Sequence, residues 1–147
     1  MNGHGTQPSV LRLALMRYID ARQASIIQAR RDLGVNELDA RAILYISANP
    51  GTRPTALREY LGITSAGVTT LVDRLVQHRA VRRDVDDQDR RVNRLTLTVD
   101  LGTAPWSALT RFDTQFDAAL AAADCAESAR FAEALDNLTT SASAPLA

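Results

Sequence analysis

Two amphipathic helices are predicted in the first third of the chain. Apolar residues recur every three or four positions over residues 9–33, and Gly34 follows as a C-terminal stop. A second helix should begin after Asn36, a favoured N-cap residue, with Asp39 in a capping-box-like position, and should end at residues 49–51. The predicted apolar faces are Leu11, Leu15, Tyr18 and Ile26 in the first helix, and Leu38, Ala42, Tyr45 and Ile46 in the second.

Two shorter helices follow, joined by a turn of only a few residues. The first begins near Pro54, which is tolerated in a first helical turn, and ends at Gly62. Thr64 is placed to cap the second, whose apolar residues follow the i, i+3, i+4, i+7, i+8 spacing without a gap. The predicted apolar faces are Leu57, Tyr60 and Leu61, and then Val68, Leu71, Val72, Leu75 and Val76.

The period then changes from that of a helix to that of a strand. Residues 81–85 and 94–99 are predicted to form a β-hairpin around the charged turn at residues 86–91. Gly102 and Pro105 separate this hairpin from a long final helix and a last helical segment, after which the end of the chain is expected to fray. The apolar stripes are Leu109, Phe112, Phe116, Leu120 and Ala123, and then Phe131, Leu135 and Leu138.

Length and composition fit one domain, or a compact domain with dimerisation arms. The chain has 147 residues, of which 46% are hydrophobic, enough for a core. Apolar runs such as residues 118–123 are much shorter than the roughly 20 residues of a membrane span, and the first nine residues show no secretory signal. The single cysteine, Cys125, excludes an internal disulfide. A soluble, cytoplasmic protein without a membrane partner is predicted.

The net charge is zero, but its distribution is uneven. Residues 53–94 hold nine arginines against six acidic residues, whereas residues 95–147 hold two arginines against seven. A basic central segment beside an acidic C-terminal segment suits a protein that meets phosphates with one region only. A solvated surface of mixed charge would give the same counts, so charge alone leaves both interpretations open.

The two short helices with a glycine-containing turn between them have the pattern of a helix-turn-helix. In that motif one helix crosses the DNA backbone while the second lies in the major groove. The polar face of the second helix carries small or hydrogen-bonding residues, which suit a close approach to base edges and phosphates. An ordinary amphipathic helix is the alternative for this element taken alone. The residues of this face are Ser65, Gly67, Thr69, Thr70, Arg74 and Gln77.

The hairpin adds a second group of polar residues, which changes that balance. Arg90 and Arg91 at its tip can place guanidinium groups along or into the minor groove, and Asp86 and Asp89 are near enough to orient them. Each arginine alone fits a solvated strand equally well, but the constellation as a whole indicates a nucleic-acid-binding wing. The flanking candidates for phosphate contacts are Arg82, Arg83 and Arg94.

Three motifs of this region resemble those of a known family. They are Val-Asp-Arg-Leu at residues 72–75, Asp-Arg-Arg at residues 89–91 and Leu-Thr-Leu-Thr at residues 95–98. With them the sequence resembles the MarR (multiple antibiotic resistance regulator) family, and the order of helices extends the resemblance over nearly the whole chain. The resemblance implies a homodimer whose first and last helices intertwine. It also implies a wing arginine, Arg91, that enters the minor groove beside its partner carboxylate, Asp89.

The resemblance further implies a small aromatic or phenolic effector, or oxidation, that lowers DNA affinity. The effector site would be a crevice between the dimerisation helices and the winged domain. Two departures from the family pattern stand out. Arg79 and Ala80 stand where the family usually has glycine, so the usual left-handed helix stop is missing, and Asp87 stands where proline is frequent. The aromatic residues that fit either the crevice or the core are Trp106, Phe112, Phe116, Tyr18 and Tyr45.

Other chemistry has little support in the sequence. Cys125 lies near Asp124 and Glu127, whose carboxylates disfavour a thiolate, so a structural role is expected rather than redox sensing. His4 and His78 have no second histidine or cysteine at metal-ligand spacing. No nucleophile triad, phosphate-binding glycine loop or paired-carboxylate motif stands out. The sequence therefore predicts no catalytic residue, metal or cofactor, and an enzyme is disfavoured.

The sequence thus predicts a mainly α fold with a small β component: a winged helix-turn-helix with N- and C-terminal dimerisation helices. The expected parts are an N-terminal arm at 1–34, a DNA-binding domain at 35–102, dimerisation helices at 103–140 and a flexible tail at 141–147. The predicted function is transcriptional regulation, as a repressor that binds double-stranded DNA at a roughly palindromic operator as a homodimer; a winged-helix module for protein–protein contact is the alternative. The residues expected to contact DNA are Thr64, Ser65, Gly67, Thr69, Thr70, Arg74, Arg90 and Arg91.

Overall fold

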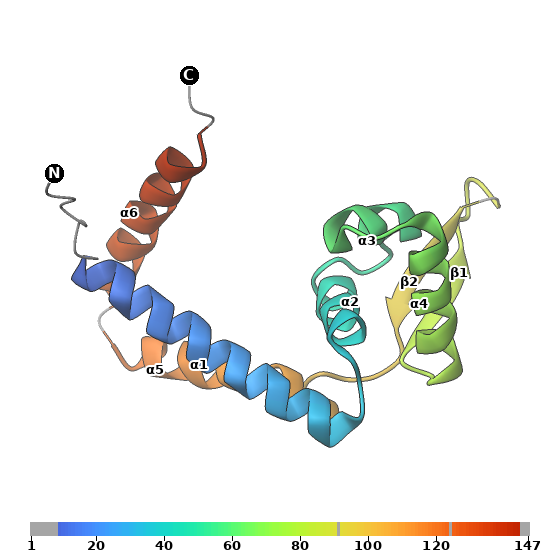
Figure 1. Cartoon of the computed structure of the whole chain (residues 1–147), viewed down its shortest axis with the longest axis horizontal. Helices are drawn as coiled ribbons and strands as arrows, with labels where there is room; N and C mark the ends of the chain where they lie inside the picture. The colour runs from blue at the N-terminus through green and yellow to red at the C-terminus, as the bar shows by residue number, and fades with distance from the viewer. Residues whose placement is uncertain (1–8, 91, 124, 145–147) are drawn as a thin grey trace, which may run out of the picture. The chain divides into compact units, whose positions relative to one another are not determined.

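The computed structural model describes residues 9–90, 92–123 and 125–144 (Figure 1). The chain divides into two compact units, Met1–Arg111 and Phe112–Ala147. The first unit contains α1 (Val10–Leu33), α2 (Glu37–Ala48), α3 (Pro54–Leu61), α4 (Ser65–Gln77), β1 (Val81–Val85), β2 (Asn93–Leu97) and the 3-10 helix η1 (Trp106–Leu109). The second consists mainly of α5 (Arg111–Ala121) and α6 (Cys125–Ser143). The predicted fold class, mainly α with one small sheet, is confirmed.

Three helices of the first unit, α1, α2 and α4, begin directly after residues whose side chains cap them. Ser9 accepts a hydrogen bond from the backbone N–H of Arg12 in α1, at 3.2 Å. Asn36 accepts from the N–H of Asp39 in α2, at 2.8 Å, and Thr64 caps α4 in the same way. These bonds satisfy N–H groups that have no partner within a helix, so the predicted starts of these helices are confirmed.

The end of α4 is unusual because an arginine takes the place of glycine. Arg79 has a φ of 54°, the only positive φ of a non-glycine residue in the described chain. The N–H of Ala80 donates to the carbonyl of Leu75 at 2.9 Å, and the N–H of Arg79 donates to that of Val76 at 3.0 Å. These two bonds form a Schellman motif, the same stop that α3 makes at Gly62. The left-handed residue expected to be missing is therefore present, although it is an arginine.

Replacing Arg79 with glycine should raise the free energy of unfolding by about 0.5–1 kcal/mol, because it relieves left-handed strain that exceeds the entropy glycine adds to the unfolded chain. Urea denaturation at one fixed protein concentration measures the change. The control is Gln77→Gly in the last turn of α4, where the backbone is helical and glycine should destabilise by roughly 0.5–1 kcal/mol. Destabilisation by both substitutions would contradict the strain at Arg79.

The core of the first unit lies where α2, α3, α4 and the hairpin meet. The apolar face predicted for α4 is confirmed, since four of its five residues are buried and Val76 is half-buried. The face predicted for α2 was partly wrong: Leu38 is 36% exposed, whereas Ile43 is fully buried. Consecutive residues of α2 are buried at Ala42 and Ile43 because its neighbours pack on a wider arc than one narrow stripe.

The predicted hairpin is confirmed, with a second strand that is shorter at its end. β1 and β2 pair antiparallel, from Val81 opposite Leu97 to Val85 opposite Asn93. The loop before α3 adds a short third edge, since the N–H of Leu95 donates to the carbonyl of Thr52 at 2.8 Å and the N–H of Gly51 donates back to Leu95 at 3.0 Å. The hairpin is thereby fixed to the helix-turn-helix rather than standing apart from it.

The predicted long final helix is broken in the structure. η1 ends at Leu109, which is buried in the core of the first unit, and α5 begins at Arg111. The hydroxyl of Thr110 donates to the carbonyl of Leu101 at 3.0 Å, and its N–H makes a 3-10 bond to Ser107, so the helix does not continue smoothly. α6 extends to Ser143, beyond the point where fraying was expected, and residues 145–147 lie outside the described residues.

The second unit presents apolar side chains on both of its helices. Phe112 and Phe116 of α5 stack with ring centroids 6.1 Å apart. Phe116 is 39% exposed, and Phe131 and Leu138 of α6 are 50% and 56% exposed. The predicted domain boundaries and dimerisation helices remain predictions. Over the range that the structure describes, each helix is too short or too polar to span a lipid bilayer.

Candidate nucleic-acid interface

α3 and α4 are joined by a tight turn that begins at Gly62. This residue has a φ of 67°, which glycine adopts without strain, and Thr64 already caps the next helix. The turn is further held by Arg58, whose Nη1 donates to Oγ of Ser65 at 3.1 Å. The chain therefore places the start of α4 directly beside the end of α3, as a helix-turn-helix requires.

The N-terminal half of α4 presents small side chains to solvent. Ser65, Thr69 and Thr70 are exposed, and Gly67 is half-buried. The hydroxyl of Thr69 donates to the carbonyl of Ser65 within the helix, at 3.0 Å. Small side chains on this face leave the helix backbone open to close approach by a partner, and their hydroxyls can donate to or accept from base edges and phosphates.

Arg74 differs from the other residues expected to contact DNA. Its guanidinium donates to both carboxylate oxygens of Asp39 on α2, with Nε at 3.0 Å from Oδ2 and Nη2 at 2.5 Å from Oδ1. These hydrogen bonds raise the pKa of Arg74 above its ordinary value. The Asp39 carboxylate was expected to complete a capping box on its own helix, but it binds an arginine 35 residues away instead. Contact between Arg74 and DNA remains a prediction.

The wing loop is organised by Asp86, one of the buried carboxylates of the first unit. Its Oδ1 accepts from the N–H groups of Gln88 and Asp89, at 2.9 Å and 3.2 Å. Its Oδ2 accepts from Nε of Arg94 at 2.5 Å, and Arg94 also donates to the carbonyl of Gly51 at 3.1 Å. Asp86 therefore shapes the turn and fastens it to the loop before α3.

The other wing arginines differ in their partners. Arg82 pairs with Asp84 at 2.9 Å, and Arg83 pairs with Asp73 of α4 at 2.5 Å. Arg90 is exposed, and no ion pair involves it in the part of the chain that the structure describes. Arg91 lies outside the described residues. Arg82, Arg83 and Arg94 are thus engaged within the protein, and among the described wing arginines Arg90 is best placed to meet a partner.

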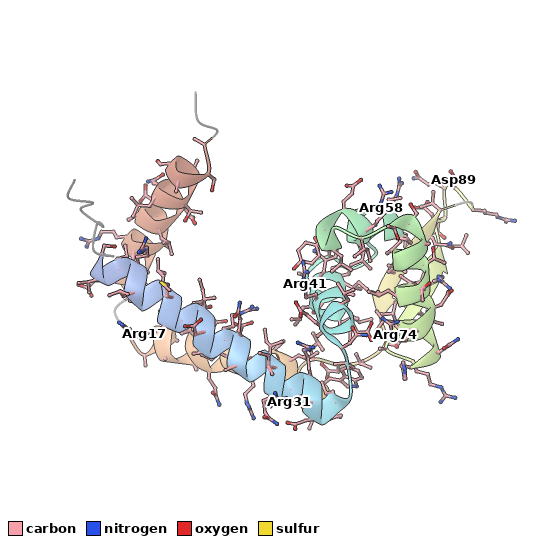
Figure 2. All side chains as sticks on the ribbon, viewed as in Figure 1. Arg17, Arg31, Arg41, Arg58, Arg74 and Asp89 are labelled. Atoms are coloured by element: carbon pink, nitrogen blue, oxygen red, sulfur yellow. The ribbon has the colours of Figure 1, made fainter. Side chains whose placement is uncertain are left out.

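The start of α4 and the wing tip, which carry most of the described candidate DNA-binding residues, lie at one end of the first unit (Figure 1). Figure 2 places Arg58 and Asp89 at this end and Arg74 nearer the other. Arg58 was not among the residues expected from sequence, although its position in the last turn of the first short helix was a usable signal.

Two aspartates of the hairpin have a pKa below the ordinary value. The hydroxyl of Thr96 is the main cause for Asp84, with a smaller contribution from Arg82. For Asp86 the main cause is the backbone N–H of Gln88, followed by Arg94. Hydrogen bonds and nearby positive charge favour the ionised carboxylate, which lowers its pKa.

The wing should therefore loosen only in acid. A lowered folded-state pKa gives stability that is complete above the unfolded value of about 3.9 and is lost as the pH falls through the folded value. The backbone N–H resonances of Gln88 and Asp89, followed by NMR from about pH 6 to pH 2, should shift below pH 4. In Asp86→Asn the acid step of these two resonances should disappear. If both resonances still shift below pH 4 in Asp86→Asn, the shift comes from the titration of another carboxylate.

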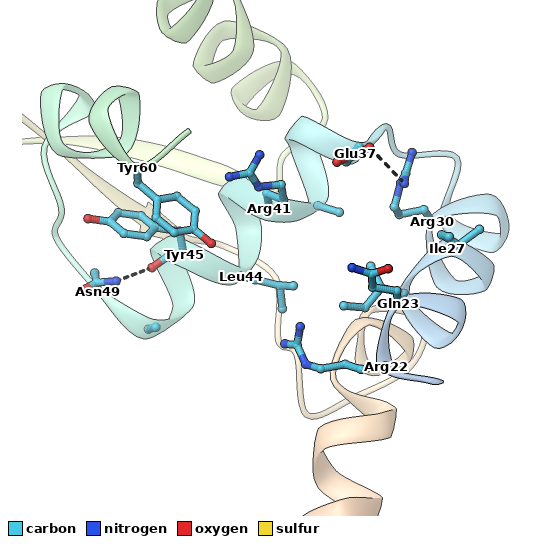
Figure 3. Close-up of a pocket in the computed structure, with 13 residues that line it drawn as sticks. Arg22, Gln23, Ile27, Arg30, Glu37, Arg41, Leu44, Tyr45, Asn49 and Tyr60 are labelled. Carbon is cyan, nitrogen blue, oxygen red and sulfur yellow. Dashed lines mark hydrogen bonds and ion pairs between the residues drawn. The ribbon is translucent and has the colours of Figure 1, made fainter. Parts of the chain in front are cut away.

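A cavity of about 810 Å³ lies between α1, α2 and α3, within the first unit (Figure 3). Tyr45 and Tyr60 stack at one side, with ring centroids 4.3 Å apart, and Cζ of Arg41 lies 5.4 Å from the centroid of Tyr60. Of the aromatic residues considered from sequence, Tyr45 lines this cavity, and Tyr60 joins it from α3.

The polar lining of the cavity is mainly basic. Arg22, Arg30 and Arg41 face it with a single carboxylate, Glu37. Nη1 of Arg30 lies 3.9 Å from Oε2 of Glu37, and its Nε is buried without a hydrogen-bond partner within the described chain. Unpartnered buried donors are uncommon, so this lining can accept a further acceptor group. No cluster of metal-binding side chains was found among the described residues, which exclude His4 and Asp124.

The helix-turn-helix, the hairpin fixed beside it and the small exposed face of α4 define a winged helix-turn-helix protein. Residues 33–92 match the family model described as MarR family. This match confirms the resemblance to the MarR family over the segment from the end of α1 to the wing. No curated protein sequence matches the chain.

Solved structures match nearly the whole chain in fold. A variant of S. aureus MepR bound to an oligodeoxyribonucleotide is 21% identical, with a TM-score of 0.57 over 92% of this chain and 99% of that one. S. aureus MepR bound to ethidium bromide is 18% identical, with a TM-score of 0.62 over 93% and 99%. The transcriptional regulator Tm0710 of Thermotoga maritima is 22% identical, with a TM-score of 0.57 over 86% and 90%. The chain has the same fold as these three proteins.

Proposed function

We propose that this protein is a transcriptional repressor that binds double-stranded DNA as a homodimer at a roughly palindromic operator. The observation that carries the proposal is the grouping of the small polar face of α4, Arg58 and the wing tip at one end of the first unit. The start of α4 would read base edges in the major groove, while Arg90 and Arg91 would lie against the minor groove. Arg58 would add a phosphate contact at the start of α4.

The homodimer is supported by apolar side chains that one subunit leaves exposed. Val10 and Met16 of α1 are 82% and 51% exposed, and Phe131 and Leu138 of α6 are 50% and 56% exposed. Burial of these side chains against a second copy of the chain would remove their apolar surface from water, which favours association. A two-fold dimer would place its two copies of α4 in successive major grooves, about 34–36 Å apart, which requires two half-sites.

Binding of the intergenic DNA next to the protein's own gene tests this proposal. The wild-type protein should shift that duplex at low salt, and affinity should fall steeply as salt rises because phosphate contacts release counterions. Arg91→Ala should weaken binding by about tenfold, as expected for one lost groove contact. The matched control is Arg31→Ala on α1, remote from the wing in Figure 2.

Three outcomes would count against parts of the proposal. Absence of any shift at low salt, with no effect of Arg91→Ala, would favour a winged-helix module that contacts protein instead. Equal losses of DNA affinity for Arg91→Ala and Arg31→Ala would show that the wing has no special role in binding. A monomer in light scattering at micromolar concentration would exclude the two-half-site arrangement.

The cavity beside α2 is the proposed site of a small aromatic effector. Tyr45 and Tyr60 offer aromatic surfaces, and Arg41 together with the unpartnered Nε of Arg30 favours an anionic group on the same ligand. The structure of S. aureus MepR with ethidium bromide supports a ligand role for this fold. Because α2 and α3 both line the cavity, an occupant that fits one arrangement of these helices better would shift DNA affinity.

Calorimetric titration with 2-naphthoate should detect binding, and its neutral analogue 2-naphthalenemethanol should bind at least about tenfold more weakly, the equivalent of 1.4 kcal/mol. Arg30→Gln should remove most of this difference, because it removes the guanidinium that carries the positive charge and the unpartnered Nε. Equal affinity for the acid and the alcohol would contradict the anionic preference.

A further inference from the structure

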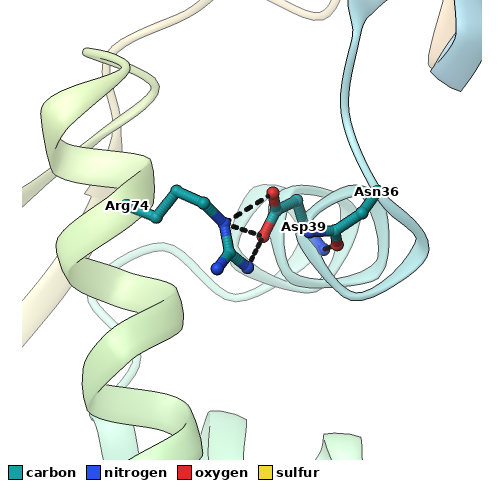
Figure 4. Close-up of polar contacts among 3 residues, drawn as sticks. All are labelled: Asn36, Asp39 and Arg74. Atoms are coloured by element: carbon teal, nitrogen blue, oxygen red, sulfur yellow. Dashed lines mark hydrogen bonds and ion pairs between the residues drawn. The ribbon is translucent and has the colours of Figure 1, made fainter.

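Asp39 is a buried carboxylate that joins two helices of the candidate DNA-binding domain. It stands in the first turn of α2, and its side chain is 6% exposed. Figure 4 shows the guanidinium of Arg74 reaching from α4 to this carboxylate, with both oxygens engaged. A buried charge is tolerated only when a partner and hydrogen bonds compensate for its lost hydration, and Arg74 supplies both.

The carboxylate is held in place from its own helix as well. The side chain of Asn36 accepts from the N–H of Asp39 at 2.8 Å, which fixes the backbone of this turn. The first turn of a helix also favours negative charge, because the backbone N–H groups there have no partner within the helix and leave a partial positive charge at that end. Asp39 is thus a fixed anchor on α2, and the two-pronged contact restricts both the distance and the rotation of Arg74 relative to it.

Arg74 points from α4 toward α2, whereas Ser65, Thr69 and Thr70 lie on the exposed face of α4. We propose that Asp39 and Arg74 are positioning residues that set the rotation of α4 for DNA binding, and that Arg74 does not contact DNA. This inference rests on the proposed function. The hydrogen bonds between Arg74 and Asp39 are directional, so they fix the C-terminal half of α4 relative to α2. Apolar packing beneath α4 is not directional, so it limits the distance between the helices more than the rotation of α4 about its axis.

The test uses full-length protein and a duplex that the wild-type protein enriches from a random-sequence pool. Asp39→Asn and Arg74→Gln should each weaken binding by roughly tenfold. The double variant should bind no more weakly than the single variant with the lower affinity, because both substitutions remove the same interaction. The slope of log affinity against log salt should stay unchanged, since no phosphate contact is lost. The control is Asp73→Asn, which removes the same charge from α4 but from a more exposed pair, with Arg83 of β1, and should not weaken binding.

A direct DNA contact by Arg74 predicts different results. Arg74→Gln would then reduce the salt slope by about 0.9, and Asp39→Asn would leave affinity equal or higher because it releases the guanidinium. Arg74→Lys separates the two cases further, since lysine serves as well for a phosphate contact but lacks the two-pronged geometry. Wild-type affinity in Arg74→Lys would therefore overturn the inference, and a loss near that of Arg74→Gln supports it.

Loss of folding is separated from loss of position by circular dichroism at the assay temperature. The inference expects folded variants with weakened binding and a wild-type salt slope. If Asp39→Asn and Arg74→Gln are unfolded, the comparison passes to Arg74→Lys and Asp39→Glu, which keep both charges and change only the geometry. Unchanged affinity in folded variants would overturn the inference alone. Failure of the wild-type protein to enrich any duplex would instead overturn the proposed function.

Discussion

Replacing Thr70 with glutamate should weaken DNA binding by about a hundredfold. Thr70 is exposed in the N-terminal half of α4, where the proposed major-groove contacts are made. One lost contact to a base edge costs roughly 1–3 kcal/mol, and a carboxylate at this place adds repulsion from the phosphates. Titration of the enriched duplex by fluorescence anisotropy at two salt concentrations measures the effect, which should be larger at low salt.

The matched control is Gln77→Glu at the other end of the same helix. Gln77 is also exposed, so this change adds the same charge to the same element at a position about 10 Å further along the axis, given the 1.5 Å rise per residue. Its effect on affinity should be no more than about threefold, because screening weakens a charge at this distance. Equal losses of affinity for both variants would show a general effect of net charge and would contradict the proposed contact between the N-terminal half of α4 and the major groove.

Replacing Ile43 with alanine should lower the free energy of unfolding by roughly 2–5 kcal/mol. Ile43 is fully buried in α2, where it packs in the core shared with α3, α4 and β2. Its loss leaves a cavity that the rigid helices around it fill only partly, and the effect is large compared with a total stability of about 5–15 kcal/mol. Urea denaturation with an unchanged slope measures it at one protein concentration, since the proposed dimerisation would link stability to concentration.

The control for this substitution is Leu38→Ala on the same helix. Leu38 is 36% exposed, and its truncation should change stability by about 0.5 kcal/mol or less in the single subunit. A larger effect of Leu38→Ala than of Ile43→Ala would mean that α2 buries a different face from the one in the structure. A similar and concentration-dependent effect would place Leu38 in a subunit interface instead.

Local signals in the sequence were sufficient for most of the elements. Ser9, Asn36 and Thr64 cap their helices through contacts within three residues, and glycine stops such as Gly62 depend on one backbone angle. The change from a period near four to a period of two marks the hairpin. These features are short-range, so they are visible in the order of residues alone. The motifs of α4 and the wing likewise carried the family resemblance that the match over residues 33–92 confirms.

Long-range contacts decided the roles of several charged residues. Asp39 was expected to serve its own helix, but its partner Arg74 is 35 positions later in the chain. Arg94 was a candidate for phosphate contact, but Asp86 and the carbonyl of Gly51, 43 positions earlier, hold it. The local sequence does not distinguish an arginine that contacts DNA from one that joins two elements of the protein. The two differ in which hydrogen-bond acceptor the fold brings near the guanidinium.

The sequence by itself therefore determined the elements, their order and the winged helix-turn-helix class, because caps, glycine stops and hydrophobic periods act over a few residues. Only the tertiary structure decided which face of α2 is buried, where the final helix breaks and how Arg79 ends α4. It also decided which arginines are held by carboxylates and that Arg90 is exposed at the wing. These properties depend on packing and ion pairs between residues far apart in the chain. The free energy of such contacts is set by burial and geometry, and the identities of neighbouring residues in the sequence do not determine it.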